Sequence, residues 1–202
     1  MIKGLFLDFG GVIADEGYRD GLYKVAQRFN LNGKEFFTGC ADLIYETGYI
    51  IGRCSQKEYF DSIRNYFKIQ IDDNLFEQMI LNSFKIRRPI LEIVQKIREK
   101  KITTAILSDQ TDWLDKLNKR EDFFHYFDFV FNSYHIGMGK RDINTFRKVA
   151  QMASLNPGEI IFIDDQLPNI ERANKAGIIG ICLGDEGEIL EFLQKEFLME
   201  VR

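Results

Sequence analysis

The sequence has 202 residues, which is large for one minimal domain and small for two, so one α/β core with an inserted subdomain is the simplest expectation. Hydrophobic residues make up 45% and charged residues 29%, a composition typical of globular proteins and not of disordered chains. The formal net charge of -4 and the absence of a long Lys/Arg-rich block argue against nucleic-acid and membrane partners and favour a small molecule.

The chain begins with a predicted buried strand, because Ile2–Asp8 is a short apolar run that ends in an acid. Helical signals follow it. Apolar residues at 22, 25, 26 and 29 share one helix face, Ser55–Glu58 is a capping box for a helix that runs to Phe67, and residues 75–84 read as a further helix. These signals predict an inserted helical subdomain over residues 16–86.

Strand and helix alternate in the rest of the chain. Pro89 begins one amphipathic helix, and Ile143 lies on the apolar face of another. Four apolar runs are predicted strands, at residues 104–108, 127–132, 159–164 and 178–183. The alternation predicts a Rossmann-like parallel sheet of five or more strands with helices on both faces, built from residues 1–15 and 87–202.

The start of the chain lacks the pattern of a signal peptide, because Asp8 interrupts its apolar run, and no apolar run approaches the roughly 18 residues of a membrane span. We therefore expect a cytoplasmic protein. Cys40, Cys54 and Cys182 are an odd number without C-x-x-C spacing, so the sequence indicates neither a disulfide framework nor a zinc site.

Polar residues follow the predicted strands where a parallel sheet binds its ligands, at the carboxyl ends. These residues are Asp8, Ser108-Asp109, Lys140 in a Gly-rich stretch, and Asp164-Asp165. An aspartate can attack phosphorus, further carboxylates can share Mg²⁺ with it, a hydroxyl can donate to a phosphoryl oxygen, and a lysine can offset the negative charge. Each residue alone is common at strand ends without any chemical role. Their joint occurrence predicts a single phosphate site.

Together these motifs resemble the signature of the haloacid dehalogenase superfamily, which has an N-terminal D-x-D-G-V, a strand-ending Ser or Thr, a distant Lys and a strand ending in two acids. The resemblance covers essentially the whole chain. The matching stretches are Leu5–Ile13, Ala105–Ser108, Gly137–Lys140 and Ile161–Gly177. The helical insertion resembles the family's cap, and residues 46–48 and 55–60 are similar to the branch with the phosphatase domain of bifunctional epoxide hydrolases and bacterial sugar-phosphate phosphatases.

The resemblance implies a phosphatase for a small phosphomonoester such as a sugar phosphate. Asp8 would attack the phosphorus and form an aspartyl-phosphate. Ser108, Asp109 and Gly11 would bind the phosphate, and Lys140 would bind it too, neutralise charge and orient the nucleophile. Asp8, Ser108 and Lys140 are thus the predicted catalytic residues, acting mainly by positioning and electrostatics.

The resemblance also implies Mg²⁺ as the cofactor, held by the Asp8 carboxylate, the carbonyl of Gly10 and Asp165, with Asp164 helping directly or through water. The cap, residues 16–86, would close over the substrate, exclude water and select the leaving group. A hydrolytic dehalogenase would use Asp8 without a metal, and the two adjacent acids argue against that class because they would repel the nucleophile.

One position departs from the family pattern: the second aspartate of the first motif, which protonates the leaving oxygen and later activates water, is Gly10 here. General acid–base assistance is worth about 10² to 10⁴ in rate, so its loss slows an alkyl phosphate without removing the metal site. Three interpretations are open. The substrate has a good leaving group, as in a sugar 1-phosphate or an acyl phosphate; Asp15 or a cap residue replaces the acid; or the chain is a catalytically weak or inactive phosphate-binding or regulatory module.

Three arginines are also of interest. Arg141 stands where the family has Pro after the motif lysine, and we expect its side chain to be solvated. Arg87 and Arg88 precede the helix that returns to the core, where they could meet a substrate anion as the cap closes.

Overall fold

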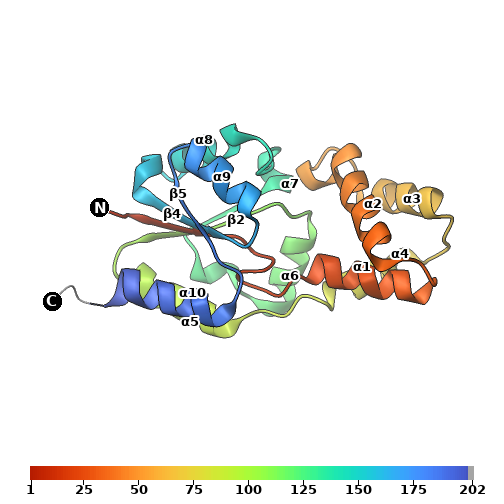
Figure 1. Ribbon diagram of the computed structural model, residues 1–202, viewed down its shortest axis with the longest axis horizontal. Coiled ribbons are helices and arrows are strands. Elements are labelled where there is room, and N and C mark those ends of the chain that lie inside the picture. The colour runs from red at the N-terminus through yellow and green to blue at the C-terminus, as the bar shows by residue number, and fades with distance from the viewer. Residues whose placement is uncertain (200–202) are drawn as a thin grey trace.

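Five parallel strands form the sheet of the computed structural model, which describes residues 1–199 (Figure 1). In spatial order they are β3 (Phe129–Asn132), β2 (Thr103–Ser108), β1 (Gly4–Leu7), β4 (Ile160–Asp164) and β5 (Ile179–Cys182). All five coincide with the predicted apolar runs to within two residues at each end. The prediction of a Rossmann-like parallel sheet is confirmed.

Helices cover both faces of the sheet. On one face lie α8 (Ile143–Met152) and α9 (Leu167–Lys175), and on the other lie α5 (Arg88–Glu99), α6 (Trp113–Glu121) and α10 (Glu186–Leu193). Successive residues of β1 alternate between the two layers, because Phe6 packs with α8 and α9 whereas Leu5 and Leu7 belong to the cluster on the other face. The buried strands therefore carry apolar residues on both sides. Short elements complete this part: η2 (Phe124–Tyr126), α7 (Ser133–Ile136), η3 (Pro157–Glu159) and η4 (Gln194–Leu198).

A helical segment follows β1 and lies beyond one end of the sheet (Figure 1). It consists of α1 (Gly17–Arg28), α2 (Gly33–Glu46), η1 (Tyr49–Ile51), α3 (Gln56–Phe67) and α4 (Asp73–Leu81). Ser55 and Glu58 form the predicted capping box of α3. Helix α2 is not among the predicted helices, although Asn32 accepts from the Glu35 amide as its N-cap and marks its start.

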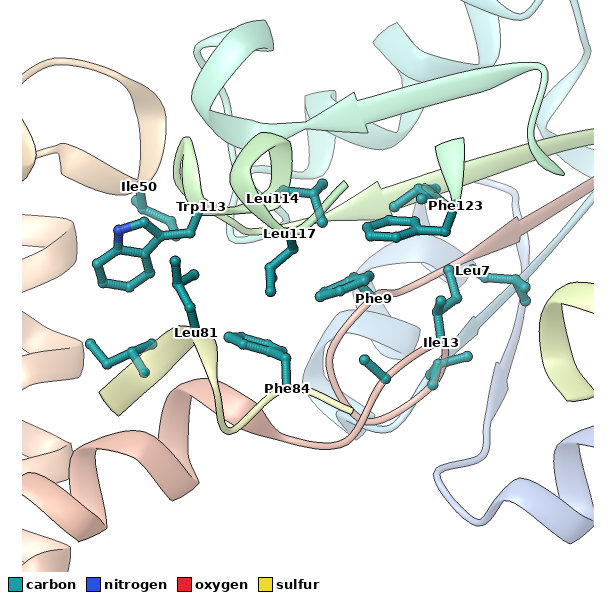
Figure 2. Packing of buried hydrophobic residues seen from close by; sticks show 14 of the residues in the cluster. Leu7, Phe9, Ile13, Ile50, Leu81, Phe84, Trp113, Leu114, Leu117 and Phe123 are labelled. Atoms are coloured by element: carbon teal, nitrogen blue, oxygen red, sulfur yellow. The ribbon is translucent and has the colours of Figure 1, made fainter. Parts of the chain in front are cut away.

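One apolar cluster joins the helical segment to the sheet (Figure 2). Phe9, directly after β1, stacks on Phe123 with ring centroids 5.2 Å apart and packs against Phe84 at 5.5 Å. Trp113, at the start of α6, is fully buried and donates from its indole nitrogen to Gln56 of α3 at 2.6 Å. Phe9 and Trp113, which follow strands β1 and β2, are therefore packed against residues of the helical segment.

No helix within residues 1–199 is both long and apolar enough to cross a membrane. All three cysteines are free thiols, with Cys40 buried, Cys54 partly buried and Cys182 exposed.

We expect Trp113→Ala to lower the free energy of unfolding by about 3–5 kcal/mol, because it leaves a cavity among the rings of Tyr49, Tyr59 and Phe60 and removes a partly buried hydrogen bond. Urea denaturation measures this loss. Tyr66→Ala is the matched control, since Tyr66 is 66% exposed and its loss should cost no more than about 0.5 kcal/mol. Equal losses in the two variants would contradict the proposed role of Trp113 in joining the two parts.

Candidate active site

The site lies where the strand order reverses direction, between β1 and β4. Leu7 is paired with Ile163, so the next residues, Asp8 and Asp164, leave neighbouring strands at the same edge. The Asp8 amide donates to the Ile163 carbonyl at 2.9 Å, which continues the ladder to the acid itself. Parallel register thus brings together two carboxylates that are far apart in the sequence.

Lys140 lies between these carboxylates. Its ammonium nitrogen is 2.7 Å from Asp8 Oδ2 and 2.6 Å from Asp164 Oδ2, and the three residues are buried. Burial alone would lower the pKa of Lys140, but the carboxylates of Asp164, Asp8 and Asp109 raise it above its ordinary value. Lys140 therefore stays charged and offsets part of the negative charge of the site.

Burial raises the pKa of the Asp8 carboxyl well above its usual range, Lys140 opposes that shift, and the Asp164 carboxylate adds to it. The Phe9 amide donates to Asp8 Oδ1 at 2.7 Å. Asp164 accepts from the Gln166 amide at 2.7 Å and from the Asn169 side chain at 3.1 and 3.2 Å. Both acids are held by hydrogen bonds, and a cation beside Asp8 would favour its ionised form.

Asp165 completes a group of three acids. Carboxylate oxygens of Asp8, Asp164 and Asp165 all lie within 4.8 Å of one another. Asp165 Oδ1 is buried and has no hydrogen-bond partner in the part of the chain that the structure describes. Burial raises the pKa of Asp165 as well. An oxygen-rich group with one unsatisfied buried oxygen is suited to a hard divalent cation.

Of the residues predicted to bind phosphate, Gly11 lies apart from Ser108 and Asp109. Ser108 and Asp109 line the same cavity as Asp8 and Lys140. The Asp109 carboxylate accepts from the Lys140 amide at 2.8 Å and from the Tyr45 hydroxyl at 3.0 Å, so it ties the lysine loop to α2. This carboxylate therefore positions Lys140 and Tyr45.

Gly11 is placed differently from the expectation. Its amide donates to the Ala14 carbonyl at 2.7 Å, and the residue lines a separate cavity beside Asp165. With φ at +80°, a Cβ at this position would lie 2.5 Å from the Asp165 carboxylate. The glycine thus leaves room for Asp165, and this geometry does not support the predicted phosphate contact.

The cavity has a volume of about 430 Å³ and lies between the sheet edge and the helical segment. Asp8, Gly10, Ser108 and Lys140 line its polar end. Its other walls include the side chains of Tyr18, Phe37, Ile44, Tyr45, Ile50 and Trp113. Such a pocket, which combines charged groups with aromatic and aliphatic walls, is typical of small-molecule sites.

The arginines also differ from expectation. Arg87 donates to the carbonyls of Gly11 and Gly184 and to Asp15 Oδ1, so it braces the loop after β1 instead of facing the cavity. Arg88 pairs with Glu121 outside the cavity. Arg141 does line the cavity, and its guanidinium lies 3.4 Å from the centre of the Tyr45 ring. Arg141 is exposed, as expected, but its guanidinium is stacked on the Tyr45 ring.

Asp15, the predicted substitute acid, is bound to Arg87 at 3.2 Å and lines the separate cavity beside Asp165. The next residue, Glu16, lines both that cavity and the cavity that contains Asp8, which Asp15 does not line. Burial raises the pKa of Glu16 to about 7, and the Asp165 charge adds to this shift. Glu16 is not among the residues predicted by name from the sequence. A weak signal exists, since Glu stands at the N-cap of α1, where Ser, Thr, Asp and Asn are the usual residues.

Comparison with known proteins gives a consistent family assignment. The family model for haloacid dehalogenase-like hydrolases matches residues 2–177. A HAD family enzyme from Bacteroides thetaiotaomicron, solved in complex with magnesium and inorganic phosphate, is 25% identical and superposes with a TM-score of 0.73. The match covers 90% of this chain and 94% of that one.

Two curated relatives match shorter stretches. Bifunctional epoxide hydrolase 2 of Rattus norvegicus is 29% identical over 117 residues, 54% of this chain and 21% of the relative. A sesquiterpene phosphatase of Aspergillus oryzae is 36% identical over 59 residues, 29% of this chain and 30% of the relative. The chain thus matches about a fifth of the length of the epoxide hydrolase.

We expect Lys140→Met to lower the free energy of unfolding by about 3–5 kcal/mol at neutral pH, because it leaves two adjacent buried carboxylates without their countercharge. Chemical denaturation in metal-free buffer measures the effect. Lys175→Met, at an exposed position of α9, should change stability by no more than about 0.5 kcal/mol. If both variants were as stable as the parent chain, Lys140 would not have the stabilising role that we assign to it.

Proposed function

The chain belongs to the haloacid dehalogenase-like hydrolase family, and we propose that it is a Mg²⁺-dependent phosphatase. Its substrate is a small phosphorylated metabolite, a sugar phosphate or a similar compound, and Asp8 carries the phosphoryl group as an aspartyl-phosphate. The observation that carries this proposal is the grouping of Asp8, Asp164 and Asp165 with Lys140 at one end of a single cavity.

The residues present fit Mg²⁺. The three carboxylates supply oxygen ligands, the unsatisfied Asp165 Oδ1 needs a partner, and one lysine does not balance the negative charge around it. Gly10 lines the same cavity and would add its carbonyl. When bound, Mg²⁺ would offset charge on the phosphoryl oxygens. The neighbour from Bacteroides thetaiotaomicron, crystallised with magnesium and phosphate, supports this assignment.

Asp8 is the nucleophile. Its carboxylate oxygen forms a bond to phosphorus as the bond from phosphorus to the leaving oxygen breaks, and water then cleaves the aspartyl-phosphate to release inorganic phosphate. Lys140, which contacts Asp8 and Asp164, orients the nucleophile and offsets charge on the transferring group. The Ser108 hydroxyl, in the same cavity, donates to a phosphoryl oxygen.

Residues 16–86 act as the cap, and residues 1–15 with 87–202 form the core. The cavity between the two parts supports this division, since its polar end comes from loops after the strands and much of its apolar wall from α1, α2 and η1. A leaving group that lies against the apolar wall of the cavity is shielded from water, and this shielding strengthens the electrostatic interactions at phosphorus. The stack of Arg141 on Tyr45 and the bond from Tyr45 to Asp109 join the two parts beside the cavity.

The apolar wall bears on the substrate. Rings such as Tyr18, Phe37 and Trp113 can stack on a sugar or pack against a hydrocarbon chain. The name of the relative from Aspergillus oryzae, a sesquiterpene phosphatase, indicates an apolar leaving group for that protein. A substrate screen should therefore contain sugar 1-phosphates, acyl phosphates and isoprenoid monophosphates.

We expect purified protein to release phosphate from at least one compound of this screen with Mg²⁺ and from none in excess chelator. Asp8→Asn should abolish turnover, because the amide cannot form the aspartyl-phosphate, and Glu35→Gln at an exposed position of α2 should not change it. Turnover near the parent rate in Asp8→Asn would exclude the covalent mechanism. Complete inactivity of folded protein that still binds beryllofluoride would favour the alternative of a phosphate-binding or regulatory module, which Gly10 leaves open.

We expect Asp165→Asn to raise the Mg²⁺ concentration for half-maximal activity by at least about 10-fold, because it removes a charged ligand. The rise in melting temperature on adding Mg²⁺ without substrate should shrink in parallel. Glu171→Gln, at an exposed position of the adjacent helix α9, is the control and should leave both readouts unchanged. An unaltered Mg²⁺ requirement in Asp165→Asn would remove Asp165 from the ligand set.

A further inference from the structure

Position 10 leaves a gap in the catalytic cavity. A side chain there would project from the loop directly after Asp8, and glycine provides none. Gly10 itself is buried and lines the cavity with Asp8, Ser108 and Lys140. Any group that donates a proton to a leaving oxygen at Asp8 must therefore reach this place from elsewhere in the chain.

The Glu16 carboxylate fills the gap. A Cβ built on Gly10 would lie 2.7 Å from Glu16 Oε1 and 3.7 Å from Glu16 Cδ, and apart from residues 9–11 no other atom of the described residues 1–199 lies within 4 Å of it. The glutamate oxygen thus lies within 2.7 Å of the point where the side chain of residue 10 would begin. A carboxylate is present at the correct place, although it comes from a residue six positions later.

The backbone sets this placement. The chain turns back after β1, with the Gly11 amide bound to the Ala14 carbonyl at 2.7 Å and the Asp15 amide bound to the Lys85 carbonyl at 3.0 Å. Glu16 is then the residue before α1, and its side chain makes no capping hydrogen bond to that helix. The side chain turns into the cavity instead.

The Glu16 carboxylate is also free to act. Among residues 1–199, the carboxylate makes no capping hydrogen bond to α1, and the charged groups near it are those of Asp165, Arg19, Lys140 and Asp20. Asp15, in contrast, is bound to Arg87 outside the cavity. Of the two adjacent acids, only Glu16 has both the position and an unoccupied carboxylate.

We propose that Glu16 is the general acid and base of the phosphatase reaction, in place of the aspartate that position 10 lacks. This inference rests on the function proposed above. In the first step the Glu16 carboxyl proton passes to the leaving oxygen as its bond to phosphorus breaks, which yields an alcohol and the aspartyl-phosphate. In the second step a water proton returns to the Glu16 carboxylate as the water oxygen bonds to phosphorus and the bond to Asp8 breaks.

Glu16→Gln tests the proposal because glutamine has the same shape and cannot transfer the proton. For an alkyl phosphate we expect kcat/KM to fall by about 10² to 10⁴, whereas for para-nitrophenyl phosphate, whose leaving group needs no proton, it should fall by less than about 10-fold. Because the second step still needs the base, para-nitrophenol should appear in a burst, and intact-protein mass spectrometry should detect one added phosphoryl group. Glu35→Gln, at an exposed position, should show neither effect.

A second variant protects the test against a folding defect. In Glu16→Ala/Gly10→Asp the new aspartate has the space that the glutamate occupied, so alkyl phosphate turnover should rise by at least about 10-fold over Glu16→Ala. Gly10→Asp alone should bring little gain, because its Cβ meets the Glu16 carboxylate. Melting temperatures of all variants report folding independently of activity.

Several outcomes would overturn the proposal. Equal losses on alkyl and aryl substrates in Glu16→Gln, with a raised Mg²⁺ requirement, would make Glu16 a metal ligand. The leaving-group dependence in Asp15→Asn instead of Glu16→Gln would assign the role to Asp15. A parent protein inactive on every phosphomonoester would overturn the proposed function together with this inference, whereas an active parent with either result above would overturn the inference alone.

Discussion

The ion pairs of Lys140 with Asp8 and Asp164 are the interaction on which the site depends. Parallel register between β1 and β4 forces the two carboxylates together in a buried place, where their repulsion and desolvation would otherwise oppose folding. One ammonium group within 2.7 Å of each acid makes this arrangement tolerable. Within residues 1–199 it leaves Asp165 Oδ1 without a hydrogen-bond partner, so the site retains negative charge that attracts a divalent cation.

The lysine must itself be held, and the groups that hold it extend into the helical segment. Asp109 accepts from the Lys140 amide and from the Tyr45 hydroxyl of α2, and Arg141 stacks on the same tyrosine. On the other side of the cavity, the cluster around Trp113 packs the start of α6 against α3. A change in the position of α2 would therefore reach Lys140 through two contacts and so alter the geometry at Asp8.

The grouping of the residues at the strand ends was predictable from the sequence, because a parallel sheet places the carboxyl ends of its strands at one edge, whatever the lengths of the connections. That rule identified Asp8, Ser108, Lys140, Asp164 and Asp165 from the sequence. Side chains that meet across the two parts were not predictable in the same way. Neither the bond from Tyr45 to Asp109 nor the bracing of the β1 loop by Arg87 leaves a local pattern, since the partners are 64 and 72–97 positions apart. The Gly11 amide is a further example, because it is bound to the Ala14 carbonyl within the turn. The phosphate contact expected of Gly11 rested on its position in the motif, which does not reveal that bond.

Asp15 and Glu16 show that a difference of one position decides which acid lines the cavity of Asp8. Both are acids at the boundary between the sheet edge and α1, and composition cannot distinguish them. Backbone pairing does, because it directs the Asp15 side chain to Arg87 and leaves Glu16 facing the gap at Gly10. If the acid and base reside on Glu16, proton transfer is attached to the first residue of the helical segment and no longer to the rigid loop after β1. The reaction would then reach its full rate only when α1 is in place, so a closed cap would be required for chemistry as well as for the exclusion of water.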